Sequence, residues 1–375
     1  MAYTGAFVDD TETDQIYAGL LSSSGENPLT FSYWPVSDAS ELAGKLFASS
    51  LDIVAIDFRL DENPDMVAPG HAYKGSALAQ LLRDRAVDDP ARDFPIVLVT
   101  AEVKMKTMYS RDRTAHDLFD KVYTKERVSG PQKAQTRKEL LALCEGYKSL
   151  KACILTGDRL TIFELPAAER EFVDHQELRS VLEEAEAPHI AAGFILREVI
   201  DRTGLLLSDN EVAARLGLEP SGVDRFAPLL TKFGLHYRGI FSQGWRRWWA
   251  HRFDFWAEEF FGCRPTRLTG TERAGKLNEH FSLGLTAALS TWNPALYEKF
   301  SFACASCNKP ASVHYSLEAY DPRVPIFGQP RRICWDCIQT GSYRAKSLKV
   351  SDADLNLVQE VERADRDKVE QEDAE

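Results

Sequence analysis

Asp52-Ile53-Val54-Ala55-Ile56-Asp57-Phe58 is a short run of apolar, β-prone residues that ends in an aspartate. Apolar residues at consecutive positions predict a strand that is buried on both faces, as in a parallel sheet. The carboxyl ends of such strands are where α/β folds hold their reactive groups. Asp57 is therefore a candidate functional residue, although an aspartate after a strand also begins ordinary turns.

Four more segments of the N-terminal third have the character of strands, and helical patterns separate them. The strands are expected at 5–8, 29–34, 94–99 and 121–125, and the helices at 37–47, 76–85, about 109–119 and after Ser129. Alternation of this kind predicts an α/β fold, a (βα)5 parallel sheet with helices on both faces. In the flavodoxin-like strand order 2-1-3-4-5, the first and third strands are neighbours.

Polar residues stand at the ends of the other strands too. Asp9 and Asp10 follow the first strand, Thr100 ends the fourth and Lys125 ends the fifth. The predicted strand order would bring these residues to the same sheet edge as Asp57. Three carboxylates at one place form a set of oxygen ligands that suits Mg²⁺ with retained waters.

This pattern resembles the receiver domain of bacterial two-component response regulators, over roughly the first third of the chain. That family has an acidic pair after strand one, a phosphate-accepting Asp after strand three, Thr or Ser after strand four and Lys after strand five. Gly75 also fits the glycine that opens the family's third helix. The resemblance implies that Asp57 is phosphorylated by a histidine-kinase-like protein or a small phosphodonor. It further implies that Asp9, Asp10 and Asp57 hold Mg²⁺, and that Thr100 and Lys125 bind phosphate oxygens.

The chain also departs from the family pattern. Glu126 replaces the proline that usually follows the strand-five lysine, and the position of the family's switch aromatic holds Val122, with Tyr123 one residue later. Residues 59–73 form a polar insertion. An alternative is therefore a receiver fold that is not phosphorylated and acts as an adaptor through protein–protein interaction.

Beyond the receiver-like domain (1–130), we expect a mainly α-helical domain (131–300), a zinc ribbon (301–350) and an acidic tail (351–375). Residues 208–232 are similar to a helix-turn-helix, with Arg225 and Lys232 on the second helix. An ordinary pair of packed helices explains the same pattern. Aromatic residues at helical spacing in 241–261, with arginines between them, predict a buried helix face; contact with nucleic acid or a partner is the alternative.

Two Cys-x-x-Cys pairs form the second strong motif: Cys304 with Cys307, and Cys334 with Cys337. Two such turns close a tetrahedral Zn²⁺ site, and the segment between them offers strands at 312–320 and 324–327 that could pair. Four cysteine ligands leave no open position for catalysis, so a structural zinc is expected. A redox role is less favoured, because there are two pairs and neither has a thioredoxin-like context.

Charge is unevenly distributed along the chain, whose net charge is −12. Residues 231–350 hold seventeen Lys and Arg against nine Asp and Glu, whereas 352–375 hold ten acids against three bases. The basic segment leaves nucleic-acid binding, and so a DNA-binding transcriptional regulator, as a further alternative.

No signal peptide or membrane span is evident, so a cytoplasmic protein is expected. We expect the helical domain and the zinc ribbon to form an output region that receives the signal from the receiver and binds a partner. No catalytic constellation follows residue 150, so this output region is not expected to be an enzyme.

Overall fold

The computed structural model describes residues 1–63, 72–107, 116–290 and 298–364 of the chain. It divides into two compact units, one of Met1–Ile200 with Arg238–Trp245 and one of Asp201–Tyr237 with Arg246–Glu375. The segment Arg238–Trp245, called the returning segment below, belongs to the first unit although its neighbours along the chain belong to the second.

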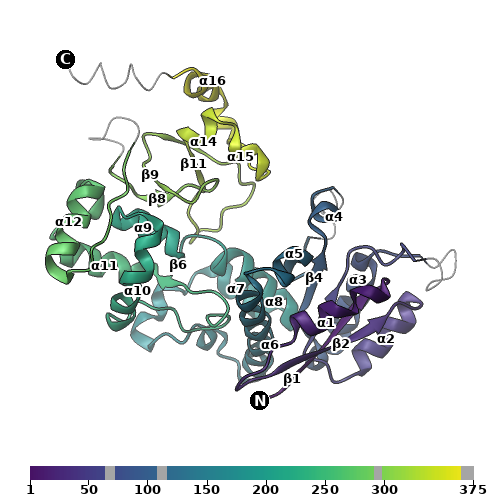
Figure 1. The fold of residues 1–375 in the computed structure, drawn as a ribbon. Helices are drawn as coiled ribbons and strands as arrows, with labels where there is room; N and C mark the ends of the chain where they lie inside the picture. Colours follow the sequence, from purple (N-terminus) through teal and green to yellow (C-terminus); the bar gives the residue numbers. More distant parts are fainter. Residues whose placement is uncertain (64–71, 108–115, 291–297, 365–375) are drawn as a thin grey trace. The chain divides into compact units, whose positions relative to one another are not determined.

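Five parallel strands form the sheet of the first unit in the order β2-β1-β3-β4-β5 (Figure 1). They are β1 (Tyr3–Asp9), β2 (Leu29–Pro35), β3 (Ile53–Ile56), β4 (Ile96–Thr100) and β5 (Lys121–Thr124). Every residue of β3 and β4 is buried, which explains why their sequences are continuous apolar runs. The predicted strands and their receiver-like order are confirmed.

Helices cover both faces of this sheet, as predicted. On one face, Leu42 and Leu78 pack in the same buried cluster as Val54 of β3. On the other face, the ring of Phe7 lies 6.2 Å from that of Tyr17, between centroids. The helices are α1 (Ile16–Leu21), α2 (Ala39–Ala48), α3 (Gly75–Asp88), α4 (Glu102–Thr107), α5 (Lys125–Ser129) and α6 (Lys133–Thr156).

The connection between β4 and β5 differs from the prediction of a helix at about 109–119. Helix α4 begins directly after β4, at Glu102, and residues 116–118 form a turn. The rest of the expected helix, 108–115, lies outside the described residues. Ser129, expected to cap the following helix, instead ends α5, and Gln132 precedes α6.

The helices that follow the sheet belong to the same compact unit and include α6, α7 (Gln176–Glu184) and α8 (Pro188–Phe194). A buried charged network joins them to the sheet. The Arg83 guanidinium lies 3.3 Å from a carboxylate oxygen of Asp93 and 2.7 Å from one of Asp120. Tyr147 of α6 donates a hydrogen bond to Asp120 at 2.7 Å, and the backbone amide of His189 donates to Asp93 at 2.6 Å. Helices α6 and α8 are therefore joined to α3 and the sheet by buried polar contacts.

The returning segment packs on helix α6. Gln135 of α6 donates a hydrogen bond to the carbonyl of Gly244 at 2.7 Å. The Phe241 ring approaches so closely that a Cβ on Gly146 would lie 2.1 Å from it. Phe241 itself has a φ of 65°, a conformation that costs a non-glycine residue free energy. Close packing against α6 holds this segment.

The second unit has a helical core built from α9 (Asp209–Leu216), α10 (Val223–Lys232), α11 (Ala250–Phe261) and α12 (Gly270–Phe281). Helices α9 and α10 lie where a helix-turn-helix was considered. Val223, Phe226 and Leu230 of α10 are buried, and Glu211 of α9 accepts a hydrogen bond from the Ala303 amide at 3.2 Å. These contacts favour an ordinary pair of packed helices.

The aromatic stretch 241–261 is only partly helical. Helix α11 begins at Ala250, and Trp248–Trp249 forms the short strand β7, which pairs with β6 (Leu206–Leu207). The expected helix over 241–249 is therefore wrong. The predicted burial is correct, because Trp248, Trp249 and Phe253 are at most 2% exposed. These three rings belong to the core, whereas Phe255 of α11 is 63% exposed.

The cysteine-rich lobe (Phe302–Arg363) also lies in the second unit. Its elements are β8 (Phe302–Ala303), β9 (Pro310–Ala311), β10 (Ser316–Glu318), β11 (Arg332–Cys334), α14 (Trp335–Gln339), α15 (Ser342–Ala345) and α16 (Leu355–Arg363). Strand β10 pairs with β11, and not with 324–327 as predicted. The second half of the acidic tail, 365–375, lies outside the described residues.

Short helical turns connect these elements: Glu12–Gln15, Pro90–Arg92, Arg159–Phe163, Ala167–Phe172, Ile195–Ile200, Pro220–Gly222, Pro265–Arg267 and Asp352–Asp354. Among the residues that the structure describes, no helix combines the length and apolar character needed to cross a bilayer.

Candidate functional site

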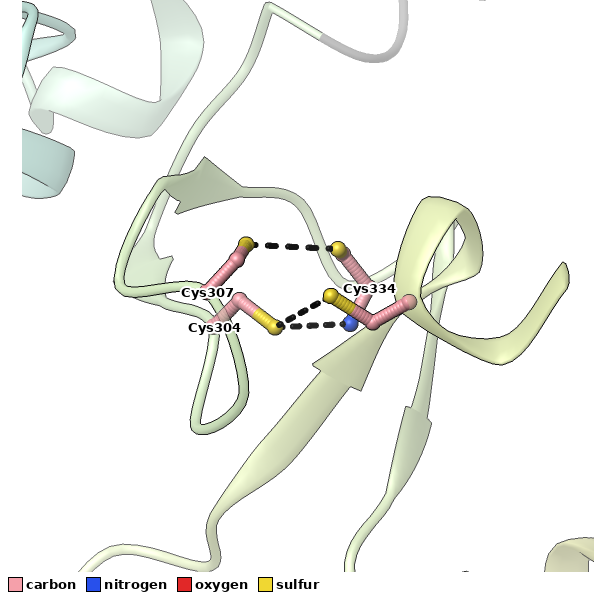
Figure 2. Close-up of side chains that lie close together, drawn as sticks. Cys304, Cys307 and Cys334 are labelled. Atoms are coloured by element: carbon pink, nitrogen blue, oxygen red, sulfur yellow. Dashed lines mark hydrogen bonds between the residues drawn. The ribbon is translucent and has the colours of Figure 1, made fainter. Parts of the chain in front are cut away.

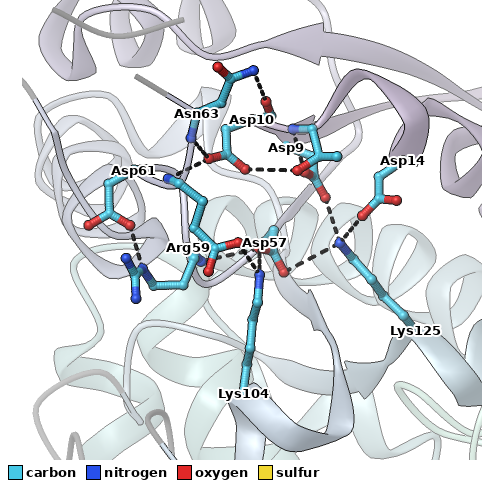
Figure 3. Close-up of polar contacts among 11 residues, drawn as sticks. Asp9, Asp10, Asp14, Asp57, Arg59, Asp61, Asn63, Lys104 and Lys125 are labelled. Carbon is cyan, nitrogen blue, oxygen red and sulfur yellow. Dashed lines mark hydrogen bonds and ion pairs between the residues drawn. The ribbon is translucent and has the colours of Figure 1, made fainter. Parts of the chain in front are cut away.

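The five polar residues predicted at the strand ends meet at one edge of the sheet. Asp9 ends β1 and Asp10 follows it, Asp57 follows β3, Thr100 ends β4 and Lys125 follows β5. All five are buried, and Lys125 is the most exposed of them at 8%. Because β1 lies beside β3, with Val8 opposite Ile56, the carboxylates after these strands converge (Figure 3). The five residues predicted from the sequence therefore form one cluster in the structure.

Lys125 is the charged centre of this cluster. Its ammonium lies 2.8 Å from Asp9, 2.5 Å from Asp14 and 3.7 Å from Asp57 (Figure 3). Burial disfavours the charged ammonium, but Asp57 and Asp9 outweigh it, and the pKa of Lys125 is raised. The ammonium is therefore a positive charge beside the Asp57 carboxylate. Asp14, on the turn before α1, was not anticipated from the sequence.

Burial disfavours the charged form of two carboxylates at this edge, Asp9 and Asp57. Burial raises the pKa of Asp9 to about 6, although Lys125 opposes this shift. The pKa of Asp57 is also raised by burial, against the lowering effects of Lys125 and Lys104. Both groups would therefore gain from an added positive charge.

Asp10 is bound by the start of the insertion that follows Asp57. Its carboxylate accepts hydrogen bonds from the backbone amides of Glu62 at 2.6 Å and Asn63 at 2.9 Å. The Asn63 side chain donates in turn to the Asp10 carbonyl at 3.2 Å. The first part of the 59–73 insertion is therefore anchored over the site.

Two buried polar atoms at this edge, Oδ1 of Asp57 and the hydroxyl oxygen of Thr100, have no partner at normal hydrogen-bond distance among the described residues. The Thr100 side chain is nevertheless close enough to Asp57 to lower the pKa of that carboxyl. Unsatisfied polar atoms in a buried site point to a ligand or solvent that completes them. Close backbone packing shapes the same place: a Cβ on Gly75 would lie 2.1 Å from the Asp57 carbonyl oxygen. This contact explains the glycine at the start of α3.

The residues fit a hard divalent cation in their chemistry, with three carboxylates and an oxygen of Asp57 that has no hydrogen bond. Among the described residues, however, only the four cysteines form a group of three or more His, Cys, Asp or Glu with ligand atoms all within 4.8 Å of one another. The three carboxylates are spread more widely, since Lys125 lies against Asp9 and Asp57 and backbone amides bind Asp10. A bound cation would have to displace part of these contacts.

A second lysine lies near Asp57 and was missed from the sequence. Lys104 of α4 lies 3.7 Å from Oδ2 of Asp57 and 2.7 Å from Glu62. The only signal in the sequence was a lysine four residues after Thr100. Its place depends on α4 beginning immediately after β4, which the sequence pattern does not indicate.

Tyr123 does not occupy the position of the family's switch aromatic. Its side chain is 1% exposed, and the Arg127 guanidinium lies 5.2 Å from the centre of its ring. Val122 points to the apolar cluster that contains α2 and α3. An aromatic rotation between inner and outer positions at residue 122 is therefore not available to this chain.

The four cysteines predicted to bind zinc lie together in the lobe. Cys304 Sγ is 3.9 Å from Cys337 Sγ, and Cys307 Sγ is 3.8 Å from Cys334 Sγ (Figure 2). A Zn–S bond of about 2.3 Å in a tetrahedron separates sulfurs by roughly 3.8 Å, whereas a disulfide brings them to about 2 Å. All four are free thiols in the structure. Their spacing and chemistry fit zinc.

Backbone amides support this cysteine cluster. The amides of Ser306 and Cys334 point to Cys304 Sγ at 3.4 and 3.2 Å. The neighbouring thiols of Cys307 and Cys334, together with the Cys334 amide, lower the pKa of Cys304 to about 7. Backbone N–H groups that point to a sulfur stabilise its thiolate form, so these two amides favour a thiolate at Cys304.

Comparisons with known proteins add a fold likeness only. No family model matches the chain, and no curated protein matches it. Among solved structures, a CheY-like response regulator receiver domain from Methylobacillus flagellatus is 18% identical, with a TM-score of 0.23, over 33% of this chain and 87% of that one.

Two structures of NtrX from Brucella abortus are also similar. The one without ADP is 18% identical, with a TM-score of 0.27, over 48% of this chain and 35% of NtrX. The one in complex with ADP is 18% identical, with a TM-score of 0.25, over 42% of this chain and 36% of NtrX. The chain thus matches about a third of NtrX. Sequence identities and TM-scores this low give no information about activity.

Proposed function

We propose that this chain is a response-regulator-like signalling protein in which Asp57 accepts a phosphoryl group. The observation that carries the proposal is the meeting of five predicted polar residues at one sheet edge, with the Lys125 ammonium against both Asp9 and Asp57. The buried Thr100 hydroxyl and Asp57 Oδ1, which have no partner at normal hydrogen-bond distance among the described residues, support the presence of a further group there.

The residues have distinct roles in this transfer. An oxygen of Asp57 forms a bond to phosphorus, and the bond from phosphorus to the donor breaks, so that the electron pair leaves with the donor. Lys125 would pair with an oxygen of the transferred group, and the Thr100 hydroxyl would donate a hydrogen bond to another. Asp9, Asp10 and Asp57 would hold Mg²⁺, which would supply charge that screens the phosphoryl group from the carboxylates. The donor is a histidine-kinase-like protein or a small phosphodonor.

The second unit is proposed as the output region. Zinc held by the four cysteines would be structural, because a closed four-cysteine site leaves no open position for chemistry. We therefore expect binding, not catalysis, from this region. Several arginines of the basic segment pair with carboxylates, such as Arg246 with Asp209 at 2.6 Å and Arg331 with Asp321 at 3.5 Å. This pairing reduces the charge available to phosphates, so a protein partner is favoured over nucleic acid.

One observation favours the adaptor alternative. Amides of Glu62 and Asn63 already satisfy the Asp10 carboxylate, and Lys125 already balances Asp9. Asp9 and Asp10 therefore have their partners without phosphate. In the adaptor, these contacts would serve stability, and Asp57 would remain unmodified.

Acetyl phosphate with Mg²⁺, followed by intact-mass measurement, separates the two. We expect the full chain to gain the mass of one phosphoryl group, and Asp57→Asn to gain none. Asp52→Asn, which changes an aspartate at the opposite end of the same strand, should behave as the wild type. A wild type that gains no mass, or an Asp57→Asn variant that still gains it, would contradict phosphorylation at Asp57.

A further inference from the structure

The acceptor carboxylate lies between two ammonium groups. Oδ1 of Asp57 faces Lys125 and Oδ2 faces Lys104, each at 3.7 Å. Figure 3 shows the two lysines reaching Asp57 along different directions, from α4 and from the end of β5. At this separation the charges attract, but the ammonium groups are beyond hydrogen-bond distance of Asp57. Both could therefore bond to oxygens carried by a group attached to Asp57.

The two lysines differ in how firmly they are held. Lys125 is within hydrogen-bond distance of both Asp9 and Asp14, and its side chain is 10% exposed. Lys104 has one close carboxylate, Glu62 at 2.7 Å, and the Glu62 side chain is 39% exposed. An exposed carboxylate regains water when an ion pair opens, so such a pair is weak. Lys104 is thus the cation that can change partner at low cost.

We propose that Lys104 is a second anion-binding residue of this site, which leaves Glu62 and binds an oxygen of the phosphoryl group on Asp57. The inference rests on the proposed function and adds a specific residue to it. A phosphoryl group carries up to two negative charges and three acceptor oxygens, so it outcompetes one exposed carboxylate. Glu62 then sets the strength of binding, because it competes for the same ammonium.

The same helix offers a matched control. Lys106 lies two residues further along α4, its side chain is 66% exposed, and it pairs with Glu102. Lys106 therefore shares the charge and the helix of Lys104, but its ion pair among the described residues is with Glu102 and not with Asp57. Replacing either lysine by methionine removes one positive charge and keeps an unbranched chain with good helix propensity.

Beryllofluoride, an anionic phosphoryl mimic, provides the test when titrated into the full chain with Mg²⁺ and followed by ¹⁹F NMR. Lys104→Met should weaken its affinity by on the order of tenfold, the value of a charged hydrogen bond. Lys104→Arg should retain part of the affinity, and Lys106→Met should match the wild type. Glu62→Gln should bind more tightly, because it releases Lys104.

A double variant distinguishes a specific contact from a general charge effect. If Glu62 acts through Lys104, the gain from Glu62→Gln should vanish in the Lys104→Met background. Equal affinity in Lys104→Met and wild type, or a full gain from Glu62→Gln without Lys104, would overturn the role of Lys104 alone. A wild type that binds no beryllofluoride would instead overturn the phosphoacceptor function and this inference with it. Since Lys104→Met lowers affinity and Glu62→Gln raises it, loss of folding cannot produce the expected pattern.

Discussion

The ammonium of Lys125 lies 2.8 Å from the carboxylate of Asp9, and both groups are buried. Even with this partner, burial raises the pKa of Asp9 to about 6 from its usual 3.8. The folded chain therefore holds the proton of Asp9 more tightly than the unfolded chain. The stability that this group contributes is present at low pH and is lost as pH rises through about 6.

Asp9→Asn should accordingly stabilise the first unit above pH 6. We expect an increase in the free energy of unfolding on the order of 2 kcal/mol at pH 7.5, which shrinks as the pH is lowered towards 4. Urea unfolding at several pH values would measure it, with the exposed Glu26→Gln as control. An Asp9→Asn protein that is less stable than the wild type at pH 7.5 would show that Lys125 depends on this carboxylate.

Replacing Arg83 should be far more harmful than replacing a surface arginine. Arg83→Met leaves Asp93 and Asp120 buried without their cation, and we expect a loss of about 3–5 kcal/mol in the free energy of unfolding. Arg92, paired with Asp89 on the surface at 3.3 Å, is the control, and Arg92→Met should cost less than about 1 kcal/mol. Equal urea midpoints for the two variants would count against the network as the fastening of α6 and α8.

Gly75→Ala should disturb the backbone at Asp57 directly. The added Cβ would lie 2.1 Å from the Asp57 carbonyl oxygen, so the start of α3 must move. We expect a loss of about 1–3 kcal/mol in stability and weaker phosphorylation by acetyl phosphate. Gly19→Ala in α1 meets no atom within 4 Å and should instead stabilise the chain by about 0.5–1 kcal/mol. Thermal unfolding of both variants makes the comparison, and a tolerated Gly75→Ala would refute the close approach.

Zinc should be bound at one ion per chain and should depend on the four cysteines. Cys304→Ser should lose the metal and expose 302–345 to proteolysis, because the lobe has a small core of its own. Cys263→Ser changes a cysteine outside the cluster and should keep the full zinc content. Elemental analysis of the purified proteins decides the point; unchanged zinc in Cys304→Ser would exclude this site. Phosphorylation of Asp57 should be unaffected by either change.

The sheet and the strand-end residues were predictable because their signals are local. Buried parallel strands read as continuous apolar runs, and parallel order alone places Asp9, Asp57 and Lys125 at one edge. The sequence signal of the two Cys-x-x-Cys pairs was equally local.

Other features depend on contacts that the sequence pattern does not encode. Lys104 reaches Asp57 only because α4 begins at Glu102, directly after β4. Arg83 finds Asp93 and Asp120 through the packing of α3 against two loops. In 241–249, the aromatic residues have the spacing of a helix. Contacts of Phe241 and Gly244 with α6 instead hold the backbone in a non-helical conformation.

The returning segment determines how this protein can be divided. The chain passes from one unit to the other after Ile200, Tyr237 and Trp245, so no single cut separates the two units. A fragment that ends at residue 200 would lack Phe241 and Gly244 and would expose the surface of α6 that they cover. Insertion of a sequence within 238–245, or removal of it, should therefore disturb the N-terminal unit from a position more than a hundred residues beyond its sheet. Gene fusions, deletions and recombination breakpoints that treat residues 1–200 as an independent unit would leave the same surface of α6 uncovered.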